Sequence, residues 1–380
     1  MTKKERVLAA IDFKEVDKIP TTYRASKYLS ESLMKYFKIK DPGNFGKNYK
    51  ELLDKIGADF WSSGSKVDRF STFIPKYKGP LPKPPYVDDG TMFYSLGIKS
   101  KIGKMNKYNI EYPNVGIDPP LANIDSPGEI KGFLTSKLEL FDFNSMKNKC
   151  GIEDLKYENI KDSNEDIICM GTLSSIFMIC CYLRGMENFL IDLVYNTKAA
   201  EAIIDEVGEF CIEFNRQELL GFGENAEYYG TWDDVAGQDG MMFSPQLFKK
   251  YFLPIYKKLI ENVKKYNLFF GWHCCGSVHD VLPSMIDAGI DVFDVVQTSA
   301  KDMELEKVYK LYGKKVCLHG GMDVQKLLVE KKPEEIKEEV KKVIDLWGNR
   351  GGIILAPSHE TLPDTPVENI LAIYEAINKV

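Results

Sequence analysis

The sequence has no uninterrupted apolar run long enough to cross a bilayer. Its longest apolar stretch, IICMGTLSSIFMICC at residues 167–181, is broken by Gly171, Thr172, Ser174 and Ser175. It is also shorter than the roughly 20 residues that a membrane helix requires. The opening segment, MTKKERVLAAIDFKEVDKIP, carries charges throughout and has no small-residue cleavage site, so it does not resemble a signal peptide. We therefore expect a cytoplasmic protein without a membrane partner.

The chain also lacks a basic block and a disulfide framework. Its 50 basic and 56 acidic residues are mixed along the sequence and leave a net charge of −6, which argues against nucleic acid as a partner. The eight cysteines lie mostly inside apolar stretches of a large chain. That usage is typical of a reducing compartment, where thiols stay free or bind metal. With 44% hydrophobic residues over 380 positions, the chain can bury a core of one large barrel or two ordinary domains.

Short apolar runs alternate with longer amphipathic segments from about residue 160 onward, which is the pattern of repeated βα units. The expected strands are residues 167–172, 226–232, 268–274, 291–296, 315–320 and 352–357, with two more upstream at 18–23 and 58–64. The expected helices are residues 26–38, 48–56, 178–195, 197–219, 244–266, 278–288, 302–312, 333–347 and 366–378. Pro254 should interrupt the helix over 244–266.

Eight strands are the number that closes a parallel (β/α)8 barrel of the TIM type. An open doubly wound sheet is the alternative, but no GxGxxG turn follows the first strand. Residues 65–135 break the pattern, because they are rich in Pro, Gly, Tyr and Lys and contain alternating stretches typical of an irregular hairpin. We expect one α/β barrel domain over residues 1–380, with an insertion after the second strand that covers the barrel mouth.

In such a barrel, functional groups lie at the carboxyl ends of the strands and in the loops that follow. Applied to these strands, the rule collects Arg24, Asp233, Asp234, His273, Cys275, Gln297, His319, Asp323, His359 and Glu360. We assign Asp233, Asp234 and Glu360 to acid/base chemistry, and Arg24, Tyr229, Gln297 and His319 to substrate binding. The alternatives are ordinary: acidic residues favour turns and helix starts, Glu360 could be a solvated loop carboxylate or support a metal ligand, and His319 could bond a nearby carbonyl.

The run GWHCCGS places His273 and Cys275 two positions apart at the end of an apolar stretch. Residues two apart on a strand share a face, so both can approach one metal ion while Cys274 points away. His359, at the end of another apolar run, would supply a second imidazole at the same mouth. Three such ligands form an open zinc site, although a hydrogen-bonded histidine beside a small buried thiol would give the same spacing.

Several segments together resemble the uroporphyrinogen decarboxylase superfamily over nearly the whole chain. They are ERVLAAIDFKEVDKIPT, YLRGMENFLIDL, WDDVAGQDGMMFSPQLFKKYFLPIYKKLIE, HCCGSVHDVLPSMIDAGIDVFDVVQ and LHGGMD followed by GGIILAPSHETLPDTPVENILAIYEAI. The decarboxylases of this superfamily carry an arginine-rich N-terminal motif of the RQAGR type. This sequence has TTYRASKYLSESL there, with Arg24 alone, so the resemblance to that branch is weaker.

The cobamide-dependent methyltransferase branch uses an HxC pair and a later cysteine in an APGCG-like loop to hold zinc. Here the pair is His273 and Cys275, and the loop reads APSHE, so His359 stands where a cysteine is expected. The resemblance implies a zinc-dependent methyltransferase that works with a corrinoid protein carrying a cobamide, and the histidine favours an O-methyl ether as methyl donor. The alternatives are a cofactor-free decarboxylase of uroporphyrinogen or a similar polycarboxylate, and a non-catalytic corrinoid or tetrapyrrole binding protein.

Overall fold

A parallel sheet of six strands forms the centre of the computed structural model, which describes residues 1–40, 45–61, 75–88, 92–105, 110–147, 169–171 and 173–378. In their order across the sheet, the strands are β14 (Ile353–Pro357), β13 (Cys317–Met322), β12 (Val292–Val296), β11 (Phe269–His273), β8 (Tyr228–Trp232) and β7 (Cys169–Met170). All six lie within the apolar runs that the sequence marked as strands, give or take two residues at the ends.

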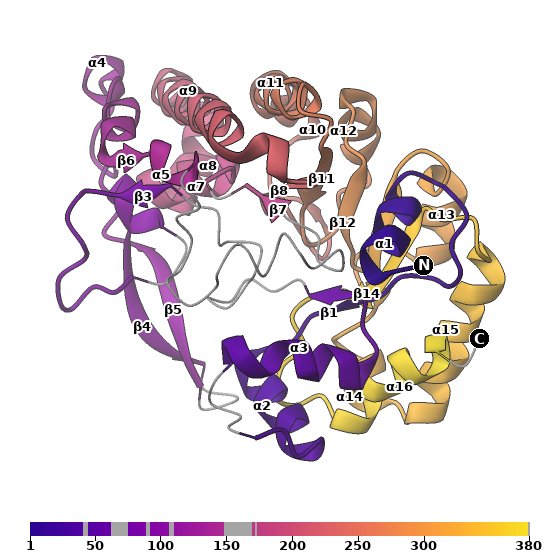
Figure 1. Ribbon diagram of the computed structural model, residues 1–380. Coiled ribbons are helices and arrows are strands. Elements are labelled where there is room, and N and C mark those ends of the chain that lie inside the picture. Colours follow the sequence, from indigo (N-terminus) through magenta and orange to yellow (C-terminus); the bar gives the residue numbers. More distant parts are fainter. Residues whose placement is uncertain are drawn as a thin grey trace.

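Two further strands continue this order at the β14 edge. β1 (Thr22–Tyr23) pairs in parallel with β2 (Phe60–Trp61), and a parallel bridge from Thr21 to Leu355 joins the β1 segment to β14. The eight strands thus follow the neighbour order of a (β/α)8 barrel, and Figure 1 shows those that it labels, from β7 and β8 through β11, β12 and β14 to β1, along an arc with helices outside. Among the described residues, β2 and β7 share no pairing that would close the ring.

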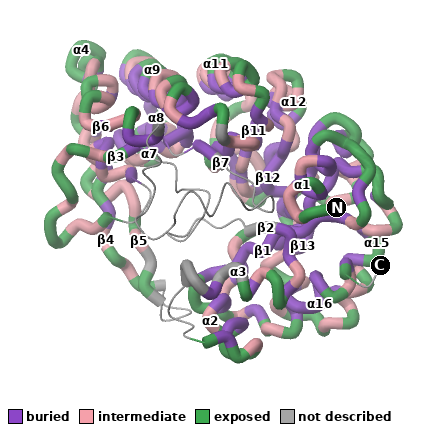
Figure 2. Tube along the Cα trace, in the orientation of Figure 1, coloured by how far each residue is buried: buried purple, intermediate pink, exposed green. Residues whose placement is uncertain are grey.

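Helices cover the outer face of the strands, and Figure 2 shows the burial of the strand segments beneath them. The helices that follow or precede the strands are α1 (Lys3–Ile11), α2 (Lys27–Tyr36), α3 (Phe45–Ile56), α9 (Thr197–Phe222), α12 (Leu282–Ala288), α13 (Leu305–Tyr312), α14 (Leu327–Glu330), α15 (Pro333–Trp347) and α16 (Val367–Asn378). Within the described ranges, none of the helices combines the length and the apolar character needed to span a membrane.

Two expected helices are divided. The segment at 178–195 forms α7 (Ile176–Arg184) and α8 (Met186–Tyr195), which meet at Gly185, whose φ of 89° is accessible to glycine without a steric penalty. The segment at 244–266 forms α10 (Pro245–Leu247), a π-helical turn η5 (Phe248–Phe252) and α11 (Leu253–Lys264). Pro254 has no amide hydrogen for the preceding turn, so the interruption appears immediately before it.

The insertion contains a long antiparallel hairpin, β4 (Lys99–Met105) with β5 (Ile110–Ile117). Around it lie β3 (Lys76–Tyr77) paired with β6 (Phe141–Asp142), and the short helices η2 (Phe93–Leu96), α4 (Pro127–Ile130), η3 (Thr135–Leu140) and α5 (Asn144–Lys147). Part of the expected insertion, including residues 65–74, lies outside the described residues. Two smaller elements, η4 (Gly223–Asn225) and the hairpin of β9 (Ala236–Gly237) with β10 (Gly240–Met241), flank β8.

Candidate metal centre and active site

Three polar residues lie side by side across three neighbouring strands. In the parallel register, His273 of β11 is paired with Asp294 of β12, and Asp294 is paired with His319 of β13. Nδ1 of His273 lies 2.5 Å from one carboxylate oxygen of Asp294, and Nδ1 of His319 lies 3.1 Å from the other. The strand register therefore brings two imidazoles to one buried carboxylate.

Arg24, which follows β1, belongs to the same cluster. Its Nη2 atom lies 2.9 Å from both carboxylate oxygens of Asp294, and its side chain is buried. Thr22 contributes its hydroxyl to Nε2 of His319 at 2.9 Å. Burial alone would raise the pKa of Asp294, but Arg24 and the two histidines hold that pKa well below its usual value. The structure thus places Arg24 and His319, both expected to bind substrate, in a buried cluster around an ionised Asp294.

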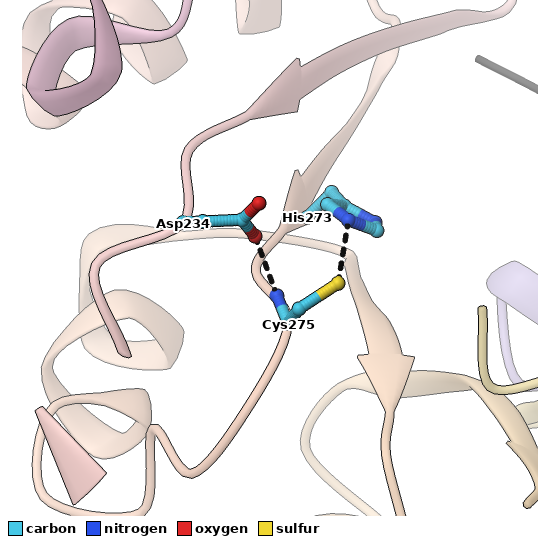
Figure 3. Close-up of side chains that lie close together, drawn as sticks. All are labelled: Asp234, His273 and Cys275. Atoms are coloured by element: carbon cyan, nitrogen blue, oxygen red, sulfur yellow. Dashed lines mark hydrogen bonds between the residues drawn. The ribbon is translucent and has the colours of Figure 1, made fainter. Parts of the chain in front are cut away.

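The two residues of the HxC pair lie next to each other at the end of β11, with His273 as its last residue and Cys275 in the loop that follows. Sγ of Cys275 is 3.4 Å from Nε2 of His273, and the amide of Cys275 donates to Oδ1 of Asp234 at 2.8 Å (Figure 3). Ligand atoms of Asp234, His273 and Cys275 all lie within 4.8 Å of one another, which makes them a candidate metal-binding group. Cys274 is buried on the other side, where its sulfur accepts the amide of Val235 at 3.3 Å.

Charge at this cluster favours the thiolate of Cys275. Burial would raise the pKa of this thiol, but the adjacent His273 and a hydrogen bond from His359 lower it to about 7. By contrast, burial raises the pKa of Cys274, as it does for the core thiols of Cys180 and Cys211. Cys275 is therefore the described cysteine best suited to bind a metal ion.

A cavity of about 530 Å³ opens beside this cluster. Its lining includes Cys275, Gln297, His359 and Glu360, together with the β9 segment. The pKa of the His359 imidazole is raised, chiefly by its interaction with the side chain of Cys275. His359 nevertheless stays outside the compact group of Asp234, His273 and Cys275. Burial raises the pKa of Glu360, so its carboxyl group is poised to hold a proton closer to neutral pH than an exposed glutamate.

Gln297 and Gly276 shape the floor of this cavity. The side-chain oxygen of Gln297 accepts the amide of Gly276 at 2.7 Å, which holds this side chain against the loop. Gly276 has φ of +85°, and a Cβ atom there would lie 2.4 Å from the carbonyl oxygen of Gly237. The glycine is required for this close approach of two backbone segments.

The side chains of two residues that the sequence assigned to the site, Asp233 and Tyr229, face helices and not the candidate metal centre. Asp233 is buried against α7, where it accepts the amides of Phe177 at 2.8 Å and Met178 at 2.9 Å and the hydroxyl of Tyr256. It satisfies the first turn of a helix, so the structure does not bring it into the group of Asp234, His273 and Cys275. Tyr229 donates to Glu218 of α9 at 2.9 Å, in the layer between sheet and helices and not at the mouth. Asp323, collected by the same rule, accepts three backbone amides at the start of α14.

Two residues were missed by sequence reasoning. Asp294 is a fully enclosed carboxylate inside an otherwise apolar strand, and that contrast was the available signal. Trp232, at the end of β8, is paired in register with His273 and keeps 42% of its surface exposed. Trp232 directly precedes Asp233 and Asp234, and its exposed ring offers an apolar surface that a ligand can contact.

The fold and this cluster define a parallel α/β protein with a histidine, a cysteine and carboxylates gathered at the carboxyl ends of its strands. The family model described as uroporphyrinogen decarboxylase (URO-D) matches residues 157–380. The chain belongs to this family, as the resemblance of its motifs indicated.

Relatives of two kinds are similar to this chain. A uroporphyrinogen decarboxylase of Geobacter sulfurreducens is 26% identical over 210 residues, which cover 54% of this chain and 58% of that protein. The methylcobamide:CoM methyltransferase MtaA of Methanosarcina barkeri is 23% identical over 385 residues, which cover 99% of this chain and 97% of that protein. The match to the decarboxylase thus spans little more than half of its length, whereas the match to the methyltransferase is nearly end to end.

A solved structure shows the same fold. The methyltransferase from Methanosarcina mazei superposes with a TM-score of 0.65 at 20% identity, over 100% of this chain and 99% of that one. At this identity the likeness concerns the arrangement of the chain alone.

Proposed function

We propose that this protein is a zinc-dependent methyltransferase that moves a methyl group between a small methylated substrate and a corrinoid carried on a separate protein. The observation that carries the proposal is the pairing of Cys275 Sγ with His273 Nε2 at 3.4 Å, with the other ring nitrogen of His273 held by Asp294. The end-to-end match to a methylcobamide:CoM methyltransferase supports it.

The donor set fits zinc. A tetrahedral zinc ion with ligands at about 2.0 Å for nitrogen and about 2.3 Å for sulfur holds those two atoms about 3.5 Å apart. The Sγ to Nε2 distance of 3.4 Å is already of this size. A thiolate, an imidazole and one further ligand make a three-ligand site with an open position, which is the catalytic arrangement.

We propose His359 as the third ligand, as its place in the sequence motif implies. His359 lines the same cavity as Cys275, and the two side chains shift each other's pKa, which supports an approach of the ring to the sulfur. Asp234 is the competing candidate, because it belongs to the compact group in the structure, although one of its oxygens is engaged by the Cys275 amide. Either choice leaves the fourth position open for substrate.

Bound zinc would supply Lewis acidity toward the heteroatom that carries the methyl group. The residues of this chain would position the metal ligands and transfer the proton. Asp294 orients His273, the Asp234 carboxylate fixes the backbone of Cys275, and Gln297 anchors the loop at Gly276. Glu360, with its raised pKa at the cavity wall, would deliver or accept the proton of the demethylated heteroatom.

The substrate is proposed to be an O-methyl ether, because a second imidazole in place of a thiolate leaves the site less negative and its metal more electrophilic.

The eight strands are proposed to close into a TIM-type barrel, with the insertion over residues 65–135 covering the mouth. The corrinoid protein would then approach the carboxyl ends of the strands, where the cavity opens.

Zinc content and methyl transfer test this function together. Purified wild-type protein should contain one zinc ion per chain, and the Cys275→Ser variant should lose it. The zinc-loaded protein should also methylate cob(I)alamin from an O-methyl ether donor such as a methoxylated benzoate, which is followed by the absorbance of methylcobalamin. A metal-free wild-type protein, or one whose zinc content is unaffected by Cys275→Ser, would refute the proposal.

Decarboxylation of uroporphyrinogen is the second candidate, favoured by the family model and by the decarboxylase relatives. That reaction needs cations at the mouth for several carboxylate arms, and the one arginine that the first strand supplies there is bound to Asp294. Turnover of uroporphyrinogen by metal-stripped protein would decide in favour of this candidate.

A further inference from the structure

Asp294 determines which nitrogen of His273 is available at the mouth. An ionised carboxylate only accepts hydrogen bonds, so the contact of 2.5 Å to Nδ1 of His273 requires the proton on Nδ1. Nε2 is then the nitrogen that can release its proton and bind a metal ion, and it is the atom that faces Cys275 Sγ. Without Asp294, the imidazole could carry its proton on either nitrogen and could rotate about its side-chain bonds.

The carboxylate of Asp294 is itself held from two sides. Arg24 reaches it from the β1 segment with Nη2 at 2.9 Å from both oxygens, and His319 reaches it from β13. Because the strand register already places the backbone of Asp294 beside His273, the carboxylate has little freedom to leave the imidazole. Arg24 also supplies the positive charge that a buried carboxylate needs.

We propose that Asp294 is a positioning residue of the metal centre, which fixes the tautomer and the orientation of His273, and that Arg24 holds Asp294 in place for this task. The inference rests on the proposed function only in naming zinc as the ion. It gives Arg24 a role through Asp294 in place of the substrate contact expected from sequence.

Histidine NMR tests the first half without any metal or substrate. The chain has only four histidines, so ¹⁵N-histidine labelling gives a spectrum that single-histidine variants can assign. Against the effect of burial, Asp294 and Cys275 raise the pKa of His273, so the spectrum is recorded at a pH above that pKa, where the metal-free wild-type protein should keep the proton on Nδ1 and not on Nε2. In Asp294→Asn it should become a mixture of tautomers. Protonation of His273 on Nε2 alone in the wild-type protein would overturn the inference.

Zinc affinity tests whether Asp294 supports the metal centre. By competition with a chelator, Asp294→Asn should bind zinc about 10–100-fold more weakly than the wild-type protein. The matched control is Asp291→Asn, a carboxylate at the opposite end of the same strand that accepts the amide of Phe270. It should leave zinc affinity unchanged. Wild-type affinity in Asp294→Asn, or an equal loss in Asp291→Asn, would overturn the inference.

A double variant separates a loss of zinc affinity at the site from a loss caused by unfolding of the protein. Asp294→Asn alone leaves Arg24 as a buried cation without its carboxylate, which is a strongly destabilising change. Arg24→Gln combined with Asp294→Asn removes both charges and should fold while still binding zinc weakly. If the wild-type protein itself bound no zinc, the proposed function would fail, and the tautomer of His273 would still decide the role of Asp294.

Discussion

Oδ1 of Asp234 accepts the backbone amide of Cys275 at 2.8 Å, so this carboxylate is tied to the loop that presents the thiol. Asp234 therefore has a supporting role even without a metal, and it competes with His359 for the third ligand position. The two residues enter from different loops, one after β8 and one after β14, so single substitutions separate their contributions.

We expect His359→Ala to weaken zinc binding more than Asp234→Asn does. The imidazole would be lost as a ligand, whereas asparagine at 234 still offers an oxygen to the Cys275 amide. Chelator competition on the two variants measures the difference. If Asp234→Asn proves the more damaging substitution, Asp234 is the third ligand and His359 is a residue of the cavity wall.

Alkylation of the metal-free protein should select Cys275. Its side chain is partly exposed and its pKa is lowered to about 7, whereas Cys180, Cys181, Cys211, Cys274 and Cys317 are buried and have raised pKa values. Iodoacetamide at pH 7.5, followed by peptide mass spectrometry, should modify Cys275 faster than those five. Added zinc should slow its modification. Equal rates at Cys274 and Cys275 would contradict the assignment of the thiol.

Substitution of Asp233 should destabilise the fold. The side chain supplies acceptors for two amides in the first turn of α7, so Asp233→Ala should cost about 1–3 kcal/mol of unfolding free energy. Zinc affinity should change little, because the carboxylate faces α7. Urea denaturation measures the first effect and chelator competition the second; a fully stable Asp233→Ala variant would contradict the capping role.

The contribution of Asp233 should also depend on pH. Burial raises the pKa of this carboxyl group from 3.8 to about 7 in the folded protein. Binding of this proton therefore stabilises the folded state fully below pH 3.8, and this stabilisation is lost as the pH rises through 7. Relative to Asp233→Asn, the metal-free wild-type protein should lose unfolding free energy between pH 4.5 and pH 8. The same difference at both pH values would show that Asp233 has an ordinary pKa.

Glu360→Gln should reduce methyl transfer without loss of zinc. If Glu360 moves the proton of the reacting heteroatom, its removal should lower kcat about 10²–10⁴-fold. Asp364, another carboxylate at the wall of the same cavity, provides the control. Asp364→Asn should retain most of the activity. An unchanged kcat in Glu360→Gln would remove the residue from the mechanism.

Most of the sheet could be predicted from sequence because its strands are buried on both faces and appear as continuous apolar runs. The strand over 268–274 and the strand over 352–357 are found within a residue or two. The exact placement of helices was less accessible. Gly185 divides one expected helix, and the π-helical turn before Pro254 depends on packing that no local pattern reveals.

At the site, strand parity was the useful rule, and it was applied too narrowly. It separated Cys275 from Cys274, and the structure has the two thiols on opposite sides. The same alternation separates Asp234, which faces Cys275, from Asp233, which faces α7. Asp294 could not be assigned in this way, because its importance arises from residues on three other segments that come together only in the folded chain.

X-ray absorption at the zinc edge of the wild-type protein tests the central claim most directly. We predict one sulfur ligand at about 2.3 Å, from Cys275, with nitrogen or oxygen ligands at about 2.0–2.1 Å, and no bound zinc in Cys275→Ser. A zinc shell with no sulfur, one with two sulfurs, or a wild-type protein that binds no zinc would contradict it.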